Sequence, residues 1–147
     1  TINYDKGYTY KISDLKLIKK TINFIGKEYA KGSYFAVVSN QSGIGRNYFT
    51  EADSINFFNA INMKLIELNL ANINHYYFCP HLPIINEGIN QGYSCICRKP
   101  SPYLIQKAIC DLGVKKINTI FIGDQETDKK AAKLAGVKLL NINEINE

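Results

Sequence analysis

Short apolar stretches of strand length alternate along this chain with longer amphipathic stretches, and this alternation constrains the fold most. Residues 34–38 are continuously apolar, and further strands are predicted over 73–78, 119–122 and 137–142. Continuous apolar runs of this length are typical of strands that are buried on both faces of a parallel sheet. The intervening helices supply the crossover connections that parallel pairing requires. The sequence therefore predicts a single α/β domain, residues 1–147, with a mainly parallel sheet.

Four helices are predicted from apolar spacing and from the residues at their ends. Residues 1–18 are predicted to form an extended loop or small hairpin, and the first helix spans about 20–31. The second helix follows Thr50, an N-cap residue with acidic side chains in the next turn. Ser101-Pro102 is predicted to be the N-cap and first residue of the third helix, and the fourth spans about 127–134. The apolar stripe of the second helix is predicted to contain Ile55, Phe58, Ile61, Leu65 and Leu68.

A group of cysteines and one histidine predicts a metal site. Cys79, His81, Cys95 and Cys97 are arranged as C-x-H and C-x-C, and three thiolates with one imidazole form a common ligand set of structural zinc. Disulfides are the alternative, but four unevenly spaced cysteines without a visible signal peptide favour zinc. The fourth cysteine, Cys110, is expected to pack on the apolar face of its helix. The loop from Cys79 to Cys97 is thus predicted to bind zinc.

Polar side chains follow three of the predicted strands. Ser39 and Asn40 follow the first, Lys99 follows the metal loop, and Asp124 follows the third. The carboxyl ends of parallel strands meet at one edge of a sheet, so these residues are expected to share a crevice. A hydroxyl and an amide can hold phosphate oxygens, Lys99 can neutralise a phosphoryl group, and Asp124 is a natural Mg²⁺ ligand. This grouping predicts a phosphate site.

Two further features have two interpretations each. Gly43 and Gly45 let backbone N–H groups approach an anion, or they simply form a turn. Asp128 supports the same site from behind, or it is only an acidic residue in the first turn of a helix. His75 and His81 are the only histidines, and the sequence contains neither a G-x-S-x-G elbow nor a nucleotide-binding glycine motif. Serine-hydrolase and nucleotide-binding functions are therefore disfavoured.

The composition limits the partners of the protein. The net charge is +5, yet the lysines are dispersed, which disfavours nucleic acid and suits a small anionic substrate. No apolar run approaches the ~20 residues of a membrane span. A thiol-rich metal site indicates a reducing compartment, so we expect a cytoplasmic protein, and we expect it to be a monomer.

The motifs together resemble one family across essentially the whole chain. The matching residues are Thr1-Ile2-Asn3 with Gly7-Tyr8, then 39–46, Cys79-Pro80-His81, 95–100, and Gly123-Asp124 with Asp128. They are similar to haloacid-dehalogenase (HAD) superfamily phosphatases, and within them to the D-glycero-D-manno-heptose-1,7-bisphosphate 7-phosphatases. The related histidinol-phosphate phosphatases share the zinc loop, which keeps histidinol phosphate as an alternative substrate. The resemblance implies a HAD-like Rossmannoid three-layer sandwich and a role in supplying heptose for lipopolysaccharide.

The resemblance also implies roles for particular residues. Lys99 and Ser39 would act in catalysis, and Asp124 would bind Mg²⁺ with Asp128 behind it. The zinc would be structural, and the substrate would be a small phosphorylated sugar. The residues implied in substrate binding are Ser39, Asn40, Gln41, Arg98 and Lys99.

The family's catalytic aspartates stand in an Asp-x-Asp-Gly segment immediately before Thr-Ile-Asn, and this sequence begins at Thr1. The resemblance implies that the first of them forms an aspartyl-phosphate and that its strand is central to the sheet. We therefore expect the chain as written to lack about a dozen residues and to have no turnover by that route. A zinc-stapled binding domain without catalysis is the alternative of another class. Gln125 stands where the heptose enzymes often carry lysine, which weakens the expectation of a bisphosphate substrate.

Overall fold

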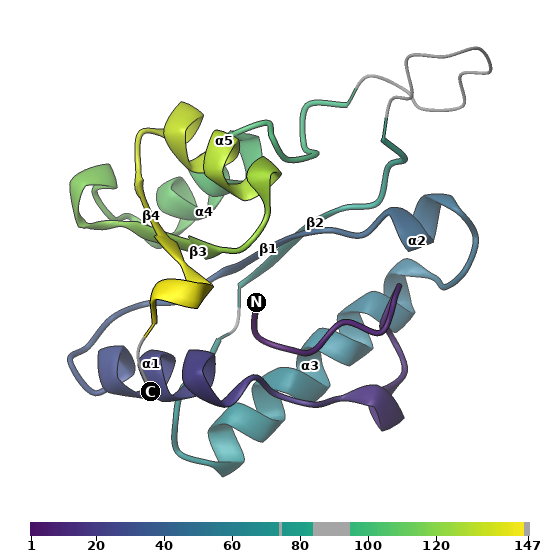
Figure 1. Cartoon of the computed structure of the whole chain (residues 1–147), viewed down its shortest axis with the longest axis horizontal. Coiled ribbons are helices and arrows are strands. Elements are labelled where there is room, and N and C mark those ends of the chain that lie inside the picture. The colour runs from purple at the N-terminus through teal and green to yellow at the C-terminus, as the bar shows by residue number, and fades with distance from the viewer. Residues whose placement is uncertain (74, 84–94, 146–147) are drawn as a thin grey trace.

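The computed structural model describes residues 1–73, 75–83 and 95–145, and it places helices on both sides of a layer of parallel strands (Figure 1). The helices are α1 (Lys19–Tyr29), α2 (Ser42–Gly45), α3 (Glu51–Glu67), α4 (Tyr103–Leu112) and α5 (Glu126–Ala135), with 3-10 turns η1 (Ile12–Asp14), η2 (Lys116–Asn118) and η3 (Ile142–Glu144). The strands are β1 (Val37–Asn40), β2 (Tyr76–Cys79), β3 (Ile120–Gly123) and β4 (Lys138–Asn141).

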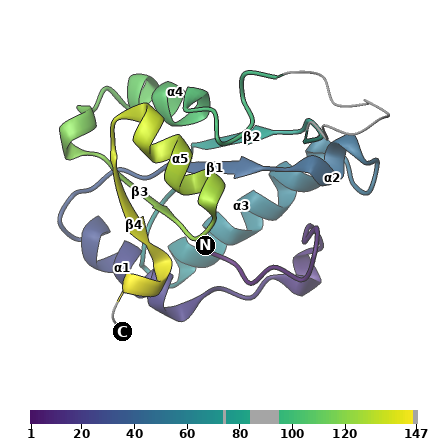
Figure 2. The ribbon, with the colours of Figure 1, turned by 45° about the horizontal axis from the view of Figure 1, so that its top comes forward.

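The described strands form two separate parallel pairs. β1 pairs with β2, with Val37 opposite Tyr76, and β3 pairs with β4, with Ile120 opposite Lys138. Figure 2 shows α4 and α5 on one side of the strands and α3 on the other, which gives three layers. The predicted α/β class with parallel strands is confirmed.

Each helical layer has its own apolar core, and two neighbouring residues of β1 contribute one side chain to each core. Val37 packs against the α1–α3 core, while Val38 packs against the α4–α5 core, as alternation along a strand requires. The first core contains Ile25, Phe57, Phe58, Ile61, Leu65, Ala71 and Ile73. The second contains Ile105, Ile109, Ala131 and Ala135. A strand covered on both faces explains why the neighbouring residues Val37 and Val38 are both apolar.

The N-terminal segment folds back on itself before α1. Asn3 and Leu17 form an antiparallel bridge, the Tyr4 N–H donates to the Lys16 carbonyl at 2.9 Å, and the Ile18 N–H donates to the Ile2 carbonyl at 2.8 Å. The predicted small hairpin is therefore confirmed, although only one bridge meets the strand criterion.

The first strand differs from its predicted bounds. Tyr34 is highly exposed, and β1 begins at Val37 and continues through Ser39 and Asn40. Pairing decides these bounds, because the ladder starts where the Val37 N–H reaches the His75 carbonyl at 2.8 Å. Apolar composition alone cannot locate that partner.

Three details of the predicted helices are wrong. Ile55 and Leu68 are exposed, and the buried stripe of α3 instead contains Ser54 and Phe57 beside the predicted Phe58, Ile61 and Leu65. Cys110 is also exposed, because it lies one position past the buried Ile109 and so turns about 100° away from the α4 core. Helix α4 begins at Tyr103, so Pro102 is the N-cap residue and not the first helical residue.

The predicted N-cap of α3 is confirmed as a full capping box. The Asp53 N–H donates to Thr50 Oγ1 at 3.1 Å, and Asp53 Oδ2 accepts from the Thr50 N–H at 2.8 Å. The hydrogen bond from the Thr50 backbone holds the pKa of the Asp53 carboxyl below its ordinary value.

This capping box predicts a stability difference that depends on pH. A carboxylate with a depressed pKa stabilises the fold above the pKa of the unfolded chain and loses that contribution as pH falls through the folded pKa. We expect Asp53→Asn to lower the free energy of unfolding at pH 7, and we expect this deficit to shrink at an acidic pH of about 2.5, where more of the Asp53 carboxyl is protonated. Urea unfolding at both pH values measures this, with the exposed Glu51→Gln as control. A deficit of Asp53→Asn that is equal at both pH values would contradict it.

Candidate functional site

The predicted zinc ligands come together at the end of β2. Cys79 Sγ lies 3.5 Å from Cys95 Sγ and 2.9 Å from Cys97 Sγ, and His81 Nδ1 lies 3.4 and 3.3 Å from Cys79 and Cys97. The four ligand atoms lie within 4.8 Å of one another. A tetrahedral zinc with these ligands has edges of about 3.6–3.8 Å, only slightly longer than most of these distances. The four residues therefore fit zinc. Residues 84–94 of the loop lie outside the described residues.

The three thiols of this cluster differ in the direction in which their pKa is shifted. Burial raises the pKa of the Cys79 and Cys97 thiols. Burial also acts on Cys95, but the pKa of Cys95 is lowered because the Arg98 N–H and the neighbouring thiols hydrogen-bond to it. Zinc is bound by thiolates, so zinc binding here displaces thiol protons and weakens as pH falls.

Lys99 and Asp128 form a buried ion pair behind the strand ends. Lys99 Nζ lies 2.6 Å from Asp128 Oδ1, and their side chains are only 11% and 4% exposed. Lys99 Nζ also donates to the Val38 carbonyl at 3.3 Å and lies 5.5 Å from the ring centre of Phe121. The pair thus fixes the cation at the carboxyl ends of β1 and β3.

Asp128 caps α5 and also pairs with Lys99, so the two interpretations of this carboxylate are compatible. Asp128 Oδ2 accepts from the N–H groups of Asp124 and Gln125 at 3.2 and 3.0 Å, which caps α5, while Oδ1 pairs with Lys99. Gly123 makes room for this carboxylate, because a Cβ on Gly123 would come within 2.6 Å of Asp128 Cβ. One carboxylate, that of Asp128, therefore caps the helix and neutralises Lys99.

Asn40 is engaged with the backbone of Lys99. Its Nδ2 donates to the Lys99 carbonyl at 3.1 Å, and its Oδ1 accepts from the Lys99 N–H at 3.0 Å. Gln41 Nε2 donates to Ser39 Oγ at 2.9 Å, and Arg98 Nη1 donates to the His81 carbonyl at 3.1 Å. Asn40 therefore positions Lys99, a function that the sequence did not suggest.

Asp124 lies at the end of β3, close to the first residue of the chain. Its Oδ1 accepts from Thr1 Oγ1 at 3.0 Å, and its Oδ2 accepts from Gln125 Nε2 at 2.9 Å. Partial burial raises the pKa of Asp124, but these hydrogen bonds and the charge of Lys99 bring it below its ordinary value. An ionised, partly exposed carboxylate of this kind can bind Mg²⁺. The contacts with Thr1 and Gln125 were not predicted.

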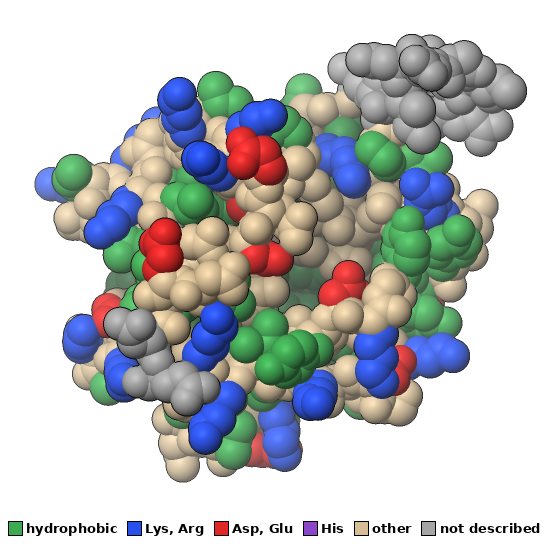
Figure 3. Space-filling model, in the orientation of Figure 1, with side chains coloured by type: hydrophobic (Ala, Val, Ile, Leu, Met, Phe, Trp, Pro, Cys, Tyr) green, Lys and Arg blue, Asp and Glu red, His purple; other side chains and the backbone are tan. Residues whose placement is uncertain are grey.

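A cavity of about 1210 Å³ separates the two strand pairs, and all the predicted phosphate-site residues line it. It exceeds the ~300–1,000 Å³ typical of small-molecule sites. Figure 3 shows a hollow near the middle of this face, with hydrophobic side chains at its base. The residues brought together are Ser39, Asn40, Gln41, Arg98, Lys99, Asp124 and Asp128. The predicted crevice is therefore present.

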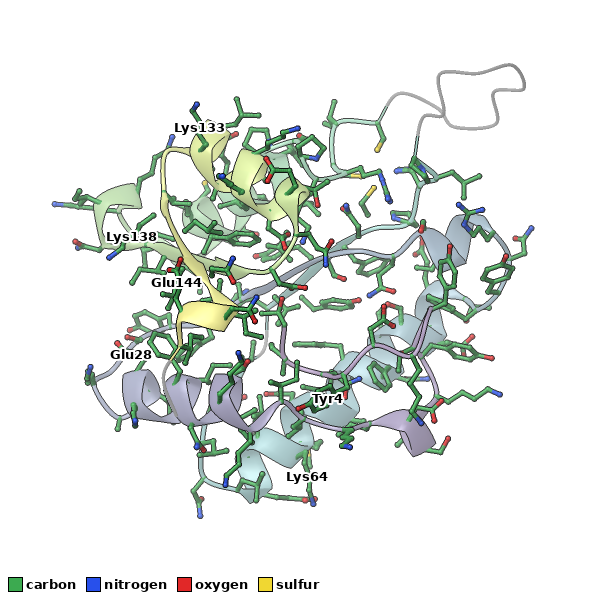
Figure 4. The ribbon with its side chains drawn as sticks, in the orientation of Figure 1. Tyr4, Glu28, Lys64, Lys133, Lys138 and Glu144 are labelled. Carbon is green, nitrogen blue, oxygen red and sulfur yellow. The ribbon has the colours of Figure 1, made fainter. Side chains whose placement is uncertain are left out.

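The lysines are distributed over the molecule. Figure 4 shows Lys64 at one end and Lys133 at the opposite end, with Lys138 on a third element. No helix among the described residues is long and apolar enough to cross a membrane. These three lysines therefore do not form one positive patch.

Comparison with known proteins agrees with this geometry. A family model described as HAD-hydrolase-like matches residues 96–143. The chain is 34% identical over 139 residues to the D-glycero-beta-D-manno-heptose-1,7-bisphosphate 7-phosphatase of Haemophilus ducreyi, covering 94% of this chain and 75% of that protein. It is also 34% identical to the D-glycero-alpha-D-manno-heptose-1,7-bisphosphate 7-phosphatase of Campylobacter jejuni, covering 97% and 77%.

A solved structure has the same fold. The D,D-heptose 1,7-bisphosphate phosphatase of B. bronchiseptica, crystallised with magnesium and phosphate, matches with a TM-score of 0.79 and 21% identity. The match covers 94% of this chain and 73% of that one. At this identity the match establishes the HAD-like fold, in agreement with the predicted class.

Proposed function

This chain belongs to the D-glycero-D-manno-heptose-1,7-bisphosphate 7-phosphatase family of HAD-like hydrolases, and we propose that it is a Mg²⁺-dependent phosphatase that removes the 7-phosphate of that heptose bisphosphate. One observation carries the proposal. A cation, a hydroxyl and a carboxylate from three separate segments, Lys99, Ser39 and Asp124, line one cavity. This combination suits a phosphoryl group and its metal ion.

Each side chain has a distinct task in this proposal. Lys99 stabilises the charge that develops on the transferring phosphoryl group, and the Asn40 amide holds the Lys99 backbone for that purpose. Ser39 donates its hydroxyl to a phosphoryl oxygen, and Gln41 orients that hydroxyl. Asp124 would bind Mg²⁺, which neutralises phosphate charge when it is present. Arg98, anchored at the His81 carbonyl, contacts the substrate.

The nucleophile comes, in this proposal, from an Asp-x-Asp-Gly strand that occupies the cavity between β1 and β3. Alternate backbone groups of β1 point away from β2 into this cavity, and the Val38 carbonyl there accepts from Lys99 Nζ at 3.3 Å. Thr21 Oγ1 lines the cavity and is buried without a hydrogen-bond partner among the described residues. Buried unpaired groups are rare in native folds, so an occupant with backbone polar groups fits.

The side chains on the cavity walls indicate which residue types that strand carries. Ile25 and Phe58 line one wall, and Ile105 and Ile109 line the opposite wall. A strand between them is apolar on both faces and parallel to its neighbours. Its carboxyl end reaches Lys99 and Asp124, where an aspartate can attack a phosphoryl group and form an aspartyl-phosphate.

A complementation experiment tests the function. We expect residues 1–147, loaded with zinc and magnesium, to release no phosphate alone and to release it when a peptide with an apolar strand and Asp-x-Asp-Gly is added. A peptide with asparagine in place of its first aspartate is the control, and malachite-green detection measures the phosphate. Release from the chain alone, unaffected by the peptide, contradicts the strand. No release in any mixture, together with retained sugar-phosphate binding, favours a zinc-stapled binding domain instead.

The same assay distinguishes the substrates. Relatives are named for both the beta and the alpha anomer of the heptose bisphosphate, so both anomers are compared with histidinol phosphate. Gln125, bonded to Asp124, supplies no positive charge for a second phosphate. Preference for histidinol phosphate would overturn the substrate assignment but not the phosphatase.

The zinc site has a structural role in this proposal. Its residues join the end of β2 to Arg98 and Lys99, so zinc fixes the approach to the cavity. Thiolate ligands require reduced cysteines, so we propose that the enzyme acts in the reducing cytoplasm and that it acts there as a monomer.

A further inference from the structure

A row of hydrogen-bonded side chains leads from the phosphate site to helix α3. Gln41 Nε2 donates to Ser39 Oγ at 2.9 Å, and the Gln41 side chain also hydrogen-bonds to the Tyr76 hydroxyl. The Tyr76 hydroxyl shares a second hydrogen bond, of 2.8 Å, with Ser54 Oγ on α3. All four residues line the cavity. Tyr76 and Ser54 therefore lie behind two groups of the phosphate site without belonging to it.

The strand register brings these groups to one face of the sheet. Val37 lies opposite Tyr76, and Ser39 lies opposite Phe78. Side chains two residues apart along a strand point to the same face, so Ser39 points to the same side as Val37. Val37 and Tyr76 both pack against the α1–α3 core. Ser54 is 4% exposed, and its hydroxyl meets Tyr76 from the α3 layer.

Packing fixes the Tyr76 ring independently of its hydroxyl. The ring stacks on Phe58 with centres 4.5 Å apart and on Phe78 with centres 5.1 Å apart. Burial raises the pKa of Tyr76, although the hydrogen bonds with Ser54 and Gln41 oppose this shift. The hydroxyl is therefore protonated at neutral pH, so it can both donate and accept a hydrogen bond.

The amide of Gln41 has two possible orientations, with opposite effects on Ser39. An amide nitrogen only donates hydrogen bonds, and an amide oxygen only accepts them. With the nitrogen at Ser39 Oγ, as observed, the Ser39 proton remains free to donate to a phosphate oxygen. If the amide were turned by 180°, its oxygen would accept the Ser39 proton instead. Only the observed orientation lets Ser39 donate to an anion while it keeps its contact with Gln41.

We propose that Tyr76 is a positioning residue that sets the orientation of the Gln41 amide and thereby keeps Ser39 a donor to phosphate. This inference rests on the proposed function. Ser54 Oγ accepts the Tyr76 proton, which leaves the Tyr76 oxygen to accept the second N–H of Gln41. Turning the amide would bring its oxygen to both hydroxyls and remove both of these N–H donors. The Tyr76 and Ser54 hydroxyls thus hold the amide before phosphate binds.

Calorimetric titration of the 147-residue chain, loaded with zinc and magnesium, with inorganic phosphate tests this role. Tyr76→Phe removes only the hydroxyl and keeps the stacked ring. We expect it to weaken phosphate binding about fivefold, the typical effect of one lost hydrogen bond. Tyr77→Phe is the matched control, because the neighbouring Tyr77 points to the other face and its hydroxyl donates to Asp111 at 2.7 Å. It should bind phosphate within about twofold of the wild type.

A double variant distinguishes positioning of Ser39 from a general loss of structure. Ser39→Ala removes the hydroxyl on which Tyr76 acts and is expected to weaken phosphate binding about tenfold. Adding Tyr76→Phe to Ser39→Ala should then weaken phosphate binding no further. A structural defect would instead weaken binding by the same factor with and without Ser39.

The outcomes separate the two proposals. If the wild type binds phosphate and Tyr76→Phe binds it equally well, the role of Tyr76 is wrong while the proposed function stands. The same conclusion follows if Tyr76→Phe has an equal effect in both backgrounds, or if Tyr77→Phe weakens binding as much as Tyr76→Phe. A wild-type chain that binds no phosphate overturns both proposals.

Discussion

Replacing Lys99 by methionine is expected to lower the free energy of unfolding by about 3 kcal/mol, the lower end of the cost of breaking a buried ion pair. The methionine side chain is similar in length to that of lysine, so the loss of stability results from removal of the charge. Asp128, only 4% exposed, would keep a buried carboxylate without its cation. The two N–H groups that bond to Asp128 Oδ2 limit the loss. Urea unfolding at pH 7 measures the difference.

Two comparisons isolate the ion pair. Adding Asp128→Asn to Lys99→Met removes the unpaired charge and keeps an oxygen for the backbone N–H groups, so about half of the loss should be recovered. Lys107→Met is the surface control, because the Lys107–Asp111 pair has the same charges at 3.0 Å but is 45% and 37% exposed. It should leave the free energy of unfolding unchanged within error. Equal losses for Lys99→Met and Lys107→Met would mean that burial does not strengthen the Lys99 pair.

Removal of zinc is expected to lower the melting temperature by about 8–16 °C. At a zinc concentration a thousandfold above its dissociation constant, binding stabilises the fold by about 4 kcal/mol, and each kcal/mol corresponds to about 2–4 °C in a domain of this size. The four ligands link the end of β2 to the segment that precedes Lys99, so removal of the zinc loosens the contact between these two segments. Calorimetry before and after chelation, with elemental analysis for one zinc per chain, measures the effect.

The chain offers its own control for the metal site. Cys97→Ser removes a ligand and should reproduce the effect of chelation, and chelator should then have no further effect. Cys110→Ser changes an exposed cysteine outside the cluster and should bind zinc and melt like the wild type. A wild-type melting temperature that does not respond to chelator, or equal losses for the two substitutions, would contradict a structural zinc.

The candidate site illustrates what residue patterns can predict. Ser39, Lys99 and Asp124 were predicted to meet because each follows a strand, and they line one cavity. The zinc ligands were predicted from ligand type and spacing, and they cluster as expected. Asn40 was predicted as a phosphate ligand, but its amide bonds to the Lys99 backbone. A pattern names the chemical groups available, whereas the partner 59 residues away is known only from the fold.

Exposure was the least predictable property of the helices. Ile55, Leu68 and Cys110 were expected to be buried and are exposed, because a shift of one position turns a helical side chain by about 100°. Apolar side chains also occur on protein surfaces, so an apolar residue is weak evidence for burial. Tyr76 was predicted only as part of a strand, and its hydrogen bonds with Ser54 and Gln41 became visible in the structure.

The sequence by itself determined the α/β class, the helix cap at Thr50, the Cys/His cluster that fits zinc, and the family, because these depend on local spacing and residue type. Only the tertiary structure decided that Lys99 is neutralised by Asp128, that Asn40 holds the Lys99 backbone, and that a large cavity separates the two strand pairs. Those features depend on which distant segments meet. Strand pairing and burial select such contacts for the whole chain together, and no local stretch encodes them.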